Sequence, residues 1–306
     1  MYQKLEKFTA TAIYFVSYIL VQSLFTATAL LPVGIRREIF ISVFSVIFAP
    51  LMGWRTRISK NLEYACPDLS ETQKKIINIK TCRNLAKTLF EVFTPKYNEK
   101  LAQKATISGP GSSILSGLVS NNQPVILVSG HFGNYDIIRS RLISQGVSIG
   151  ALYRPLNNQW LNKTYLDAIM TTGQPVFPRN KEGITSFLKH IRNGGSAALL
   201  VDQHMDNGFP VKFFGKTAYT SGSAAQIALK YRRPLIPIYA IRKENGIDFE
   251  IWVDAPIEPS NVIDMTQYLN DSLERIVRDH MDQWAWPHNR WKTARRRETH
   301  KKRNYG

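Results

Sequence analysis

The sequence predicts an α/β fold in which a mostly parallel sheet is sandwiched by helices, with an N-terminal hydrophobic membrane helix. Apolar runs alternate with helical patterns between residues 124 and 241, which is typical of parallel strands joined by helical crossovers. An uncharged stretch of 28 residues, 8–35, lies near the N-terminus. The 306 residues are 44% hydrophobic and 21% charged. That composition excludes a disordered or fibrous chain.

The uncharged stretch 8–35 is the candidate membrane segment, because a helix needs about 20 apolar residues to cross a bilayer core. A second uncharged run, 39–54, is too short to span a bilayer and predicts an interfacial or re-entrant segment. Two alternatives stay open for the first stretch. One is a signal peptide, since Ala27-Thr28-Ala29 resembles a cleavage site. The other is a buried core helix.

The net charge of +17, from 40 Lys+Arg against 23 Asp+Glu, predicts an anionic partner such as nucleic acid, a membrane surface or a phosphorylated substrate. Residues 288–306 carry eight basic side chains and one acidic one. Such a tail can bind anionic headgroups beside a membrane anchor. We therefore expect three parts: 1–60 as membrane anchor and interfacial segment, 61–292 as the α/β domain, and 293–306 as a basic C-terminal tail.

The elements follow from periodicity and turn signals. A capping box, Ser70 to Gln73, and apolar residues at helical spacing predict a helix over about 71–93. Asn245-Gly246 predicts a hairpin between two strands. Continuous short apolar runs predict buried strands. The expected strands are 125–128, 147–153, 175–177, 197–201, 235–241 and 247–253, and the further helices are 135–144, 158–170, 182–192, 221–231 and 261–284.

The loop after the first buried strand carries the candidate catalytic residues. In open α/β sheets ligands bind beyond the carboxyl ends of the strands, and this loop reads His131-Phe132-Gly133-Asn134-Tyr135-Asp136. A histidine titrates at about pH 6.5, so His131 can act as a general base. Asp136 can fold back to the ring and fix its tautomer, as in a Ser-His-Asp triad. The spacing alone also fits an incidental loop histidine.

Other candidates follow later strands. Arg154, after the second strand, is suited to phosphate, although a plain surface arginine fits too. Asp202-Gln203 reaches the same sheet edge, where Asp202 can pair with Arg154 or be an ordinary strand-end carboxylate. The helix start at Ser221 can bind an anion or be an ordinary cap. The aromatic and basic run 283–292 can stack nucleic acid bases or sit at a membrane interface.

The nucleophile motifs G-x-S-x-G, P-loop and H-E-x-x-H do not occur in the sequence. A base without a protein nucleophile indicates that the substrate brings its own nucleophile, such as a hydroxyl. Only two cysteines, Cys66 and Cys82, are present. That number excludes a disulfide scaffold and a structural zinc cluster.

These motifs together resemble the lipid A biosynthesis acyltransferases, the late acyltransferases of Gram-negative bacteria. The resemblance covers about residues 10–292 and rests on the order of its motifs. Many members have Glu where this chain has Asp136. The motifs that carry the resemblance are His131-Phe132-Gly133-Asn134-Tyr135-Asp136, Tyr153-Arg154-Pro155, Asp202-Gln203, Phe213-Phe214-Gly215 and the run 283–292.

The resemblance implies a glycerolphosphate-acyltransferase-like fold and an inner-membrane enzyme that faces the cytoplasm. It would move a fatty acyl chain from acyl carrier protein to a hydroxyl of the Kdo-bearing lipid A precursor, without a metal or other cofactor. The catalytic residues would be His131 and Asp136, and the residues assigned to substrate binding are Gly133, Asn134, Arg154, Asp202 and Gln203.

Three alternatives remain. The acceptor could be another glycolipid, such as a phosphatidylinositol mannoside, or water could replace it in a thioesterase or hydrolase. A nucleic-acid-binding module is the third alternative. The long uncharged stretch and the lack of a known nucleic-acid motif weigh against that module, so we expect no nucleic-acid partner.

Overall fold

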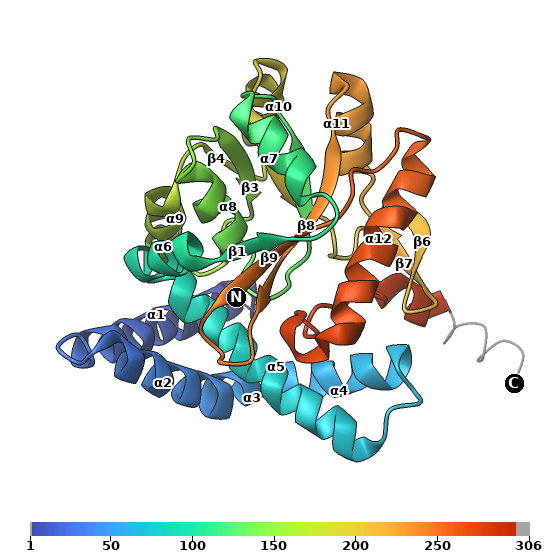
Figure 1. Ribbon diagram of the computed structural model, residues 1–306. Helices are drawn as coiled ribbons and strands as arrows, with labels where there is room; N and C mark the ends of the chain where they lie inside the picture. Colours follow the sequence, from blue (N-terminus) through green and yellow to red (C-terminus); the bar gives the residue numbers. More distant parts are fainter. Residues whose placement is uncertain (1, 298–306) are drawn as a thin grey trace, which may run out of the picture.

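A seven-stranded sheet forms the centre of the computed structural model, which describes residues 2–297 (Figure 1). The strand order is β1-β9-β8-β2-β5-β3-β4, and β6 and β7 form a separate two-stranded sheet. Only the β8–β9 pairing of the large sheet is antiparallel. The strands are β1 Thr106–Ser108, β2 Ile126–Ser129, β3 Ile149–Tyr153, β4 Val176–Pro178, β5 Ser196–Leu200, β6 Phe209–Phe213, β7 Lys216–Thr220, β8 Leu235–Arg242 and β9 Phe249–Val253.

Helices cover both faces of the sheet, because successive strand residues point to opposite faces. On one face Leu127 packs in an apolar cluster with residues of α6, α7 and α8. On the other face Ile126 and Val128 pack with residues of α10, α11 and α12. The α/β sandwich with a mostly parallel sheet is therefore confirmed. These helices are α6 Pro95–Lys104, α7 Ser112–Ser120, α8 Asp136–Ile143, α10 Lys181–Arg192, α11 Ser223–Tyr231 and α12 Val262–Asp279.

The N-terminal stretch is divided between two helices. Helix α1, Tyr2–Ala27, ends in a turn, and α2, Val33–Val43, begins after Pro32. No helix in the described part is both long and apolar enough to cross a membrane alone. The segments Val33–Leu51 and Trp54–Ala65, which meet at 75°, pass the length and composition test only as a pair. The expectation of one hydrophobic membrane helix is therefore not met by the described residues.

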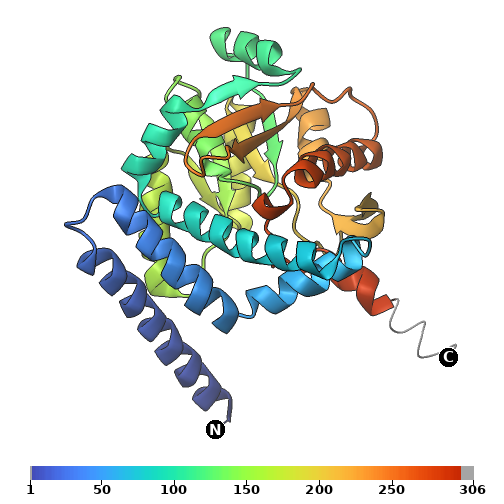
Figure 2. The ribbon, with the colours of Figure 1, turned by 60° about the horizontal axis from the view of Figure 1, so that its bottom comes forward.

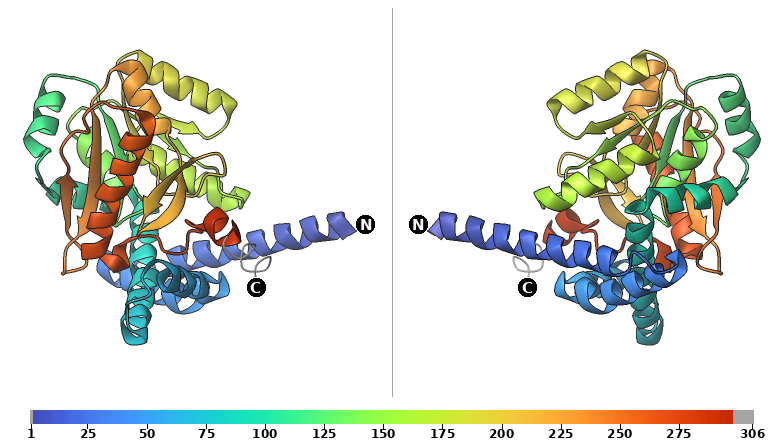
Figure 3. Two further views of the ribbon diagram at one scale, coloured as in Figure 1. Left: turned by 90° about the vertical axis from the view of Figure 1, so that its right-hand side faces the viewer. Right: turned by 90° about the vertical axis from the view of Figure 1, so that its left-hand side faces the viewer.

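Helix α1 projects past the body of the molecule and touches α9, Gln159–Thr172 (Figure 3). The Asn158 side chain donates to the Tyr14 carbonyl at 2.7 Å, and the rings of Phe15 and Trp160 lie 5.2 Å apart. Val16 and Leu20 are about half exposed, at 56% and 51%. This exposure excludes the alternative of a buried core helix.

Helices α2 to α5 form a layer beneath the sheet (Figure 2). After α2 come a π-helical turn, Phe44–Phe48, and the short α3, Ala49–Leu51. Helix α4, Trp54–Ala65, contains the position where we placed the boundary between the first two parts of the chain. Helix α5, Glu71–Val92, begins at the expected capping box on Ser70, which the hydrogen bonds confirm.

Several regions differ from the expected elements. Helix α4 and the run α6, β1 and α7 lie where the sequence predicted neither a helix nor a strand. The segment 209–220 forms the β6–β7 hairpin, where the sequence predicted no strand. The last helix, α12, ends at Asp279, followed by a 3-10 turn, Met281–Gln283, and an irregular segment. Of the predicted C-terminal tail, residues 298–306 lie outside the described residues.

Candidate active site

The carboxyl ends of β2 and β5 bring together two of the predicted residues. In the parallel register Ser129 of β2 is opposite Leu200 of β5. His131 and Asp202 each follow two positions later, so the register places them side by side. The His131 Nδ1 atom lies 2.7 Å from Asp202 Oδ1, and the His131 backbone N–H donates to Asp202 Oδ2 at 2.8 Å.

Asp202 is fully buried and ionised. Burial alone would raise the pKa of this carboxyl, but the charge of His131 and the hydrogen bonds from it, with help from His288, hold the pKa well below its usual range. The Trp284 indole N–H donates to Oδ2 at 2.9 Å. When the imidazole is neutral, an ionised acceptor at Nδ1 places the ring proton on that nitrogen, which leaves the lone pair on His131 Nε2.

Asp136 does not meet the ring, which corrects the expected geometry. Its Oδ1 accepts from Arg139 Nε at 3.3 Å and its Oδ2 from the Asn98 amide at 3.1 Å. Asp136 is the first residue of α8, and this position turns its carboxylate toward α6 and the Arg139 side chain instead of toward His131. The carboxylate that contacts the His131 ring in this structure is therefore that of Asp202, not that of Asp136.

Asn134 and Gly133 hold the loop rather than face a substrate. The Asn134 amide donates to Glu91 Oε2 at 2.9 Å and to Asn98 Oδ1 at 2.8 Å. The Gly133 N–H donates to the Gln283 carbonyl at 2.9 Å. Gly133 has φ +53°, and a Cβ there would lie 1.9 Å from the carbonyl oxygen of Ala240. The expectation that these two residues bind substrate is therefore corrected: their polar groups already have partners.

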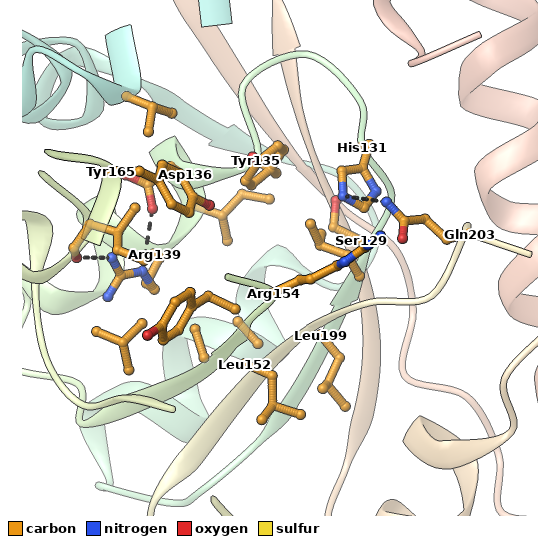
Figure 4. Close-up of a pocket in the computed structure, with 18 of the residues that line it drawn as sticks. Ser129, His131, Tyr135, Asp136, Arg139, Leu152, Arg154, Tyr165, Leu199 and Gln203 are labelled. Carbon is orange, nitrogen blue, oxygen red and sulfur yellow. Dashed lines mark hydrogen bonds and ion pairs between the residues drawn. The ribbon is translucent and has the colours of Figure 1, made fainter. Parts of the chain in front are cut away.

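A largely apolar cavity of about 460 Å³ opens beside His131 (Figure 4). Arg154 and Gln203 line it at the His131 side, and Gln203 Nε2 lies 3.3 Å from His131 Nε2. Arg154 makes no ion pair with Asp202, whose oxygens are taken by His131 and Trp284. The apolar wall includes Leu89, Val92, Leu127, Ile138, Leu152, Ile169, Val176 and Leu199.

Two tyrosines also line this cavity and were not anticipated. Tyr135 and Tyr165 are hydrogen-bonded to each other, and burial raises the pKa of both phenols. Neither phenol is therefore ionised at neutral pH. Tyr135 belongs to the quoted loop motif, but nothing in the sequence shows that its ring would meet a residue of α9.

The aromatic C-terminal run is packed against the His131–Asp202 pair. Trp284, Trp286 and Trp291 are at most 1% exposed, which excludes the interpretation of this run as a stacking surface or a membrane interface. His288, in the same run, packs against His131 with ring centroids 4.8 Å apart. Burial, the charge of His131 and that of Arg57 lower the pKa of His288 to about 4.

No metal site is evident among residues 2–297: no group of three or more His, Cys, Asp or Glu side chains there is placed to hold an ion. The site consists of a histidine that contacts an ionised carboxylate and lies at the mouth of an apolar cavity. Such a base can take a proton from a hydroxyl.

Comparisons with known proteins show the family to which the chain belongs. Residues 1–293 match the family described as bacterial lipid A biosynthesis acyltransferase. Lipid A biosynthesis acyltransferase 2 of Shigella flexneri is 24% identical over 243 residues, 76% of each chain. The lipid A biosynthesis palmitoleoyltransferase of Escherichia coli is 22% identical over 251 residues, 80% of this chain and 81% of that one.

The lipid A biosynthesis myristoyltransferase of Escherichia coli is also similar, at 22% identity over 241 residues, 76% of this chain and 73% of that one. A solved 1-acyl-sn-glycerophosphate acyltransferase of Thermotoga maritima aligns with a TM-score of 0.35 and 14% identity, covering 89% of this chain and 99% of that one. By the match over residues 1–293, the chain belongs to the bacterial lipid A biosynthesis acyltransferase family.

Proposed function

We propose that this acyltransferase moves a fatty acyl chain from an acyl carrier protein thioester to a hydroxyl of the Kdo-bearing lipid A precursor. The observation that carries the proposal is the His131–Asp202 pair at the mouth of the apolar cavity. The cavity suits a hydrocarbon chain, and the pair suits a hydroxyl nucleophile brought by the acceptor.

The reaction begins at the free nitrogen of His131. Nε2 takes the proton of the acceptor hydroxyl while the oxygen attacks the thioester carbonyl carbon. Asp202 stabilises the imidazolium that forms and keeps the ring oriented. The tetrahedral intermediate then expels the thiolate of the carrier, which receives the proton from His131. Each turnover thus makes one ester and one free thiol and returns His131 to its neutral form.

Gln203 and Arg154 contribute on the substrate side. Gln203 Nε2 stands 3.3 Å from His131 Nε2, at the place where the acceptor hydroxyl must bind. The Gln203 side chain therefore moves aside, or hydrogen-bonds the substrate, when the acceptor enters. The Arg154 side chain extends toward the same end of the cavity (Figure 4). Its guanidinium is suited to the oxyanion of the intermediate or to a phosphate.

The proposed location is the inner membrane, with the sheet on the cytoplasmic side. The exposed apolar side chains of the first 52 residues support a membrane surface as partner. The net charge of +17 supports an acidic carrier protein and an anionic lipid as substrates.

Mass spectrometry of lipid A tests the proposal. Cells with the intact chain should show one more acyl group on lipid A than cells without it, and cells with His131→Ala should match the deletion. The variant must reach the membrane fraction in normal amount, which a blot of the fractions checks. Release of free fatty acid with no change in lipid A would identify a thioesterase instead, and lipid A acylated normally by His131→Ala would reject the base.

A further inference from the structure

A second pocket, of about 180 Å³, lies beside His131 and combines apolar with polar side chains. Its lining includes Arg154 and Arg179, together with two serines, Ser221 and Ser223. His131 lines both the apolar cavity and this pocket, in which hydrogen-bond donors stand beside apolar side chains such as Met205. Nothing in the proposed acyl transfer so far uses Arg179 or the serines.

The sheet register makes the two arginines neighbours. Strands β3 and β4 are parallel, with Tyr153 opposite Pro178. The next residues along the two strands are Arg154 and Arg179, and the Arg179 N–H extends the pairing by donating to the Tyr153 carbonyl at 2.8 Å. The two cationic side chains thus leave adjacent strand ends and line the same pocket.

No carboxylate in residues 2–297 compensates this pair of charges. Neither guanidinium forms an ion pair there, and the Arg179 guanidinium donates to the Met205 thioether, a weak acceptor, at 3.0 Å. Asp202, which lies on the next strand, is fully buried and already bound by His131 and Trp284. Both residues are exposed, so water screens the repulsion between the two charges, and an anion bound between them would be favourable to both.

The serines add donors from another direction. Ser221 precedes the first turn of α11, and Ser223 is the first residue of that helix. The Ser221 hydroxyl donates to the Ser223 hydroxyl at 3.0 Å and accepts from the Ser223 N–H at 3.3 Å, so the Ser223 hydroxyl and the following N–H groups of the helix are the donors open to a ligand. Helix N-termini favour anions because of their free N–H groups and the helix dipole. Donors from two strand ends and one helix start surround an anion with tetrahedral oxygens better than a planar carboxylate.

We propose that the pocket formed by Arg154, Arg179, Ser221 and Ser223 binds the phosphate of a phosphorylated substrate and so positions that substrate beside His131. The phosphate can come from the lipid acceptor or from the phosphopantetheine arm of the donor, since both carry the same group. The choice between these two sources depends on the proposed acyl transfer, but the binding of phosphate in the pocket does not depend on it.

Kinetics of Arg179→Gln distinguish the sources. The intact chain in detergent is assayed with the phosphorylated acceptor and with the same lipid after phosphatase treatment. If the pocket binds the acceptor, Arg179→Gln raises KM roughly tenfold for the phosphorylated lipid and less than twofold for the treated one. If it binds the donor, KM for the thioester rises with both lipids. No KM change above twofold, or an equal rise for both lipids with an unchanged donor KM, overturns the proposal.

Arg192→Gln is the matched control, because Arg192 is an exposed residue at the other end of α10 and lines neither cavity. It should leave every KM unchanged. A change as large as that of Arg179→Gln would show that net charge alone is responsible, and would reject the pocket.

A binding measurement needs no lipid substrate. Inorganic phosphate, added at constant ionic strength, should raise the Tm of the wild type and of Arg192→Gln, but not that of Arg179→Gln. Equal stabilisation of all three proteins, or of none, overturns the pocket. If phosphate stabilises the wild type through Arg179 while lipid A gains no acyl group, the proposed function fails and the pocket stands. If lipid A is acylated but Arg179→Gln has no effect in either experiment, the pocket is rejected and the proposed function stands.

Discussion

At the residue scale, two carboxylates near His131 have different surroundings. Asp202 touches the imidazole directly, whereas Asp136 pairs with Arg139 and Asn98. The sequence indicated both acids and the base. The prediction that Asp136 contacts His131 was wrong. It rested on the offset of five residues, which lets a carboxylate in the next helical turn fold back, whereas the parallel register of β2 and β5 places Asp202 beside His131.

Asp202→Asn should lower kcat roughly 10³-fold. An asparagine amide can donate to Nδ1, which moves the ring proton to Nε2 and removes the lone pair that takes the hydroxyl proton. The Trp284 contact can persist through the amide oxygen, so we expect the Tm to stay within a few degrees of the wild type. Initial rates per folded protein measure the effect. A variant with more than a tenth of the wild-type kcat would show that Asp202 does not orient the base.

Asp136→Asn should act mainly on stability. The side chains of Arg139 and Asp136 are 5% and 6% exposed, and loss of the carboxylate charge leaves a buried cation without its partner. Such a loss costs about 3 kcal/mol. Denaturant unfolding measures this cost, and kcat per folded molecule should fall less than tenfold. An unchanged unfolding free energy with a kcat as low as that of Asp202→Asn would place Asp136 in the catalytic step.

His288 should make the stability depend on pH. Its folded-state pKa of about 4 lies below the ordinary value of 6.5. Between these two pH values the histidine is therefore protonated in the unfolded chain and neutral in the folded one. The groups that act on it are His131, Asp202 and Arg57. At pH 7 His288 is neutral in both states and does not affect the free energy of unfolding. As the pH falls from 6.5 to 4, protonation of the unfolded chain lowers that free energy, by about 3 kcal/mol at pH 4. His288→Asn should show a shallower fall of unfolding free energy over this range, and an identical fall would contradict the assignment.

At the element scale, a buried ion cluster joins the lower helices to the sheet and the catalytic loop. Glu91 of α5 binds Arg242 of β8 at 2.6 and 2.8 Å, lies 3.5 Å from Arg37 of α2, and accepts from Asn134 of the loop. All four side chains are buried. The cluster fixes the loop that carries His131 relative to three elements that are distant in sequence.

Glu91→Gln should therefore destabilise the whole fold. The substitution keeps the side-chain shape but leaves the buried Arg242 without a countercharge, whereas Arg37 keeps its ion pair with Glu38 at 2.8 Å. Loss of one partner of a buried pair costs about 3 to 5 kcal/mol. Denaturant unfolding measures it. Glu63→Gln is the control, because Glu63 is exposed and forms no ion pair within the described residues, and it should change the unfolding free energy by less than about 0.5 kcal/mol. Equal effects of the two substitutions would show that the cluster adds nothing.

The elements that the sequence predicted well are those whose apolar pattern reflects their own burial. Strand β2 and helix α5 were placed within one or two residues, because a continuous apolar run and a capping box are local signals. The β6–β7 hairpin and the end of α12 were missed because distant residues decide them. Arg290 donates to the Tyr219 carbonyl and the Trp291 indole to that of Phe213, which holds the C-terminal segment on the hairpin.

At the scale of the whole molecule, exposed apolar side chains gather on the helices that precede the α/β body. These helices lie together on one side of the sheet (Figures 2 and 3). The long uncharged stretch correctly indicated an apolar N-terminal region, but it gave no sign of the break after α1, which Pro32 and the turn before it produce. The exposed residues include Val16 at 56%, Leu30 at 100%, Ile35 at 51%, Val46 at 64%, Ile47 at 51%, Leu51 at 80% and Met52 at 50%.

Val46→Glu with Leu51→Glu should release the protein from membranes. Burial of one such side chain is worth about 1.5 to 3 kcal/mol, so loss of two, and the added charges, should weaken binding to phosphatidylethanolamine–phosphatidylglycerol vesicles at least a hundredfold. Both side chains are mostly exposed, so the Tm in detergent should change little. Vesicle sedimentation measures the partition. Ile263→Glu, at a half-exposed position on α12 away from these helices, is the control and should sediment as the wild type does. If the double variant still sediments with the vesicles, α1 or another surface binds the membrane, and the face formed by the π-helical turn Phe44–Phe48 and α3 does not.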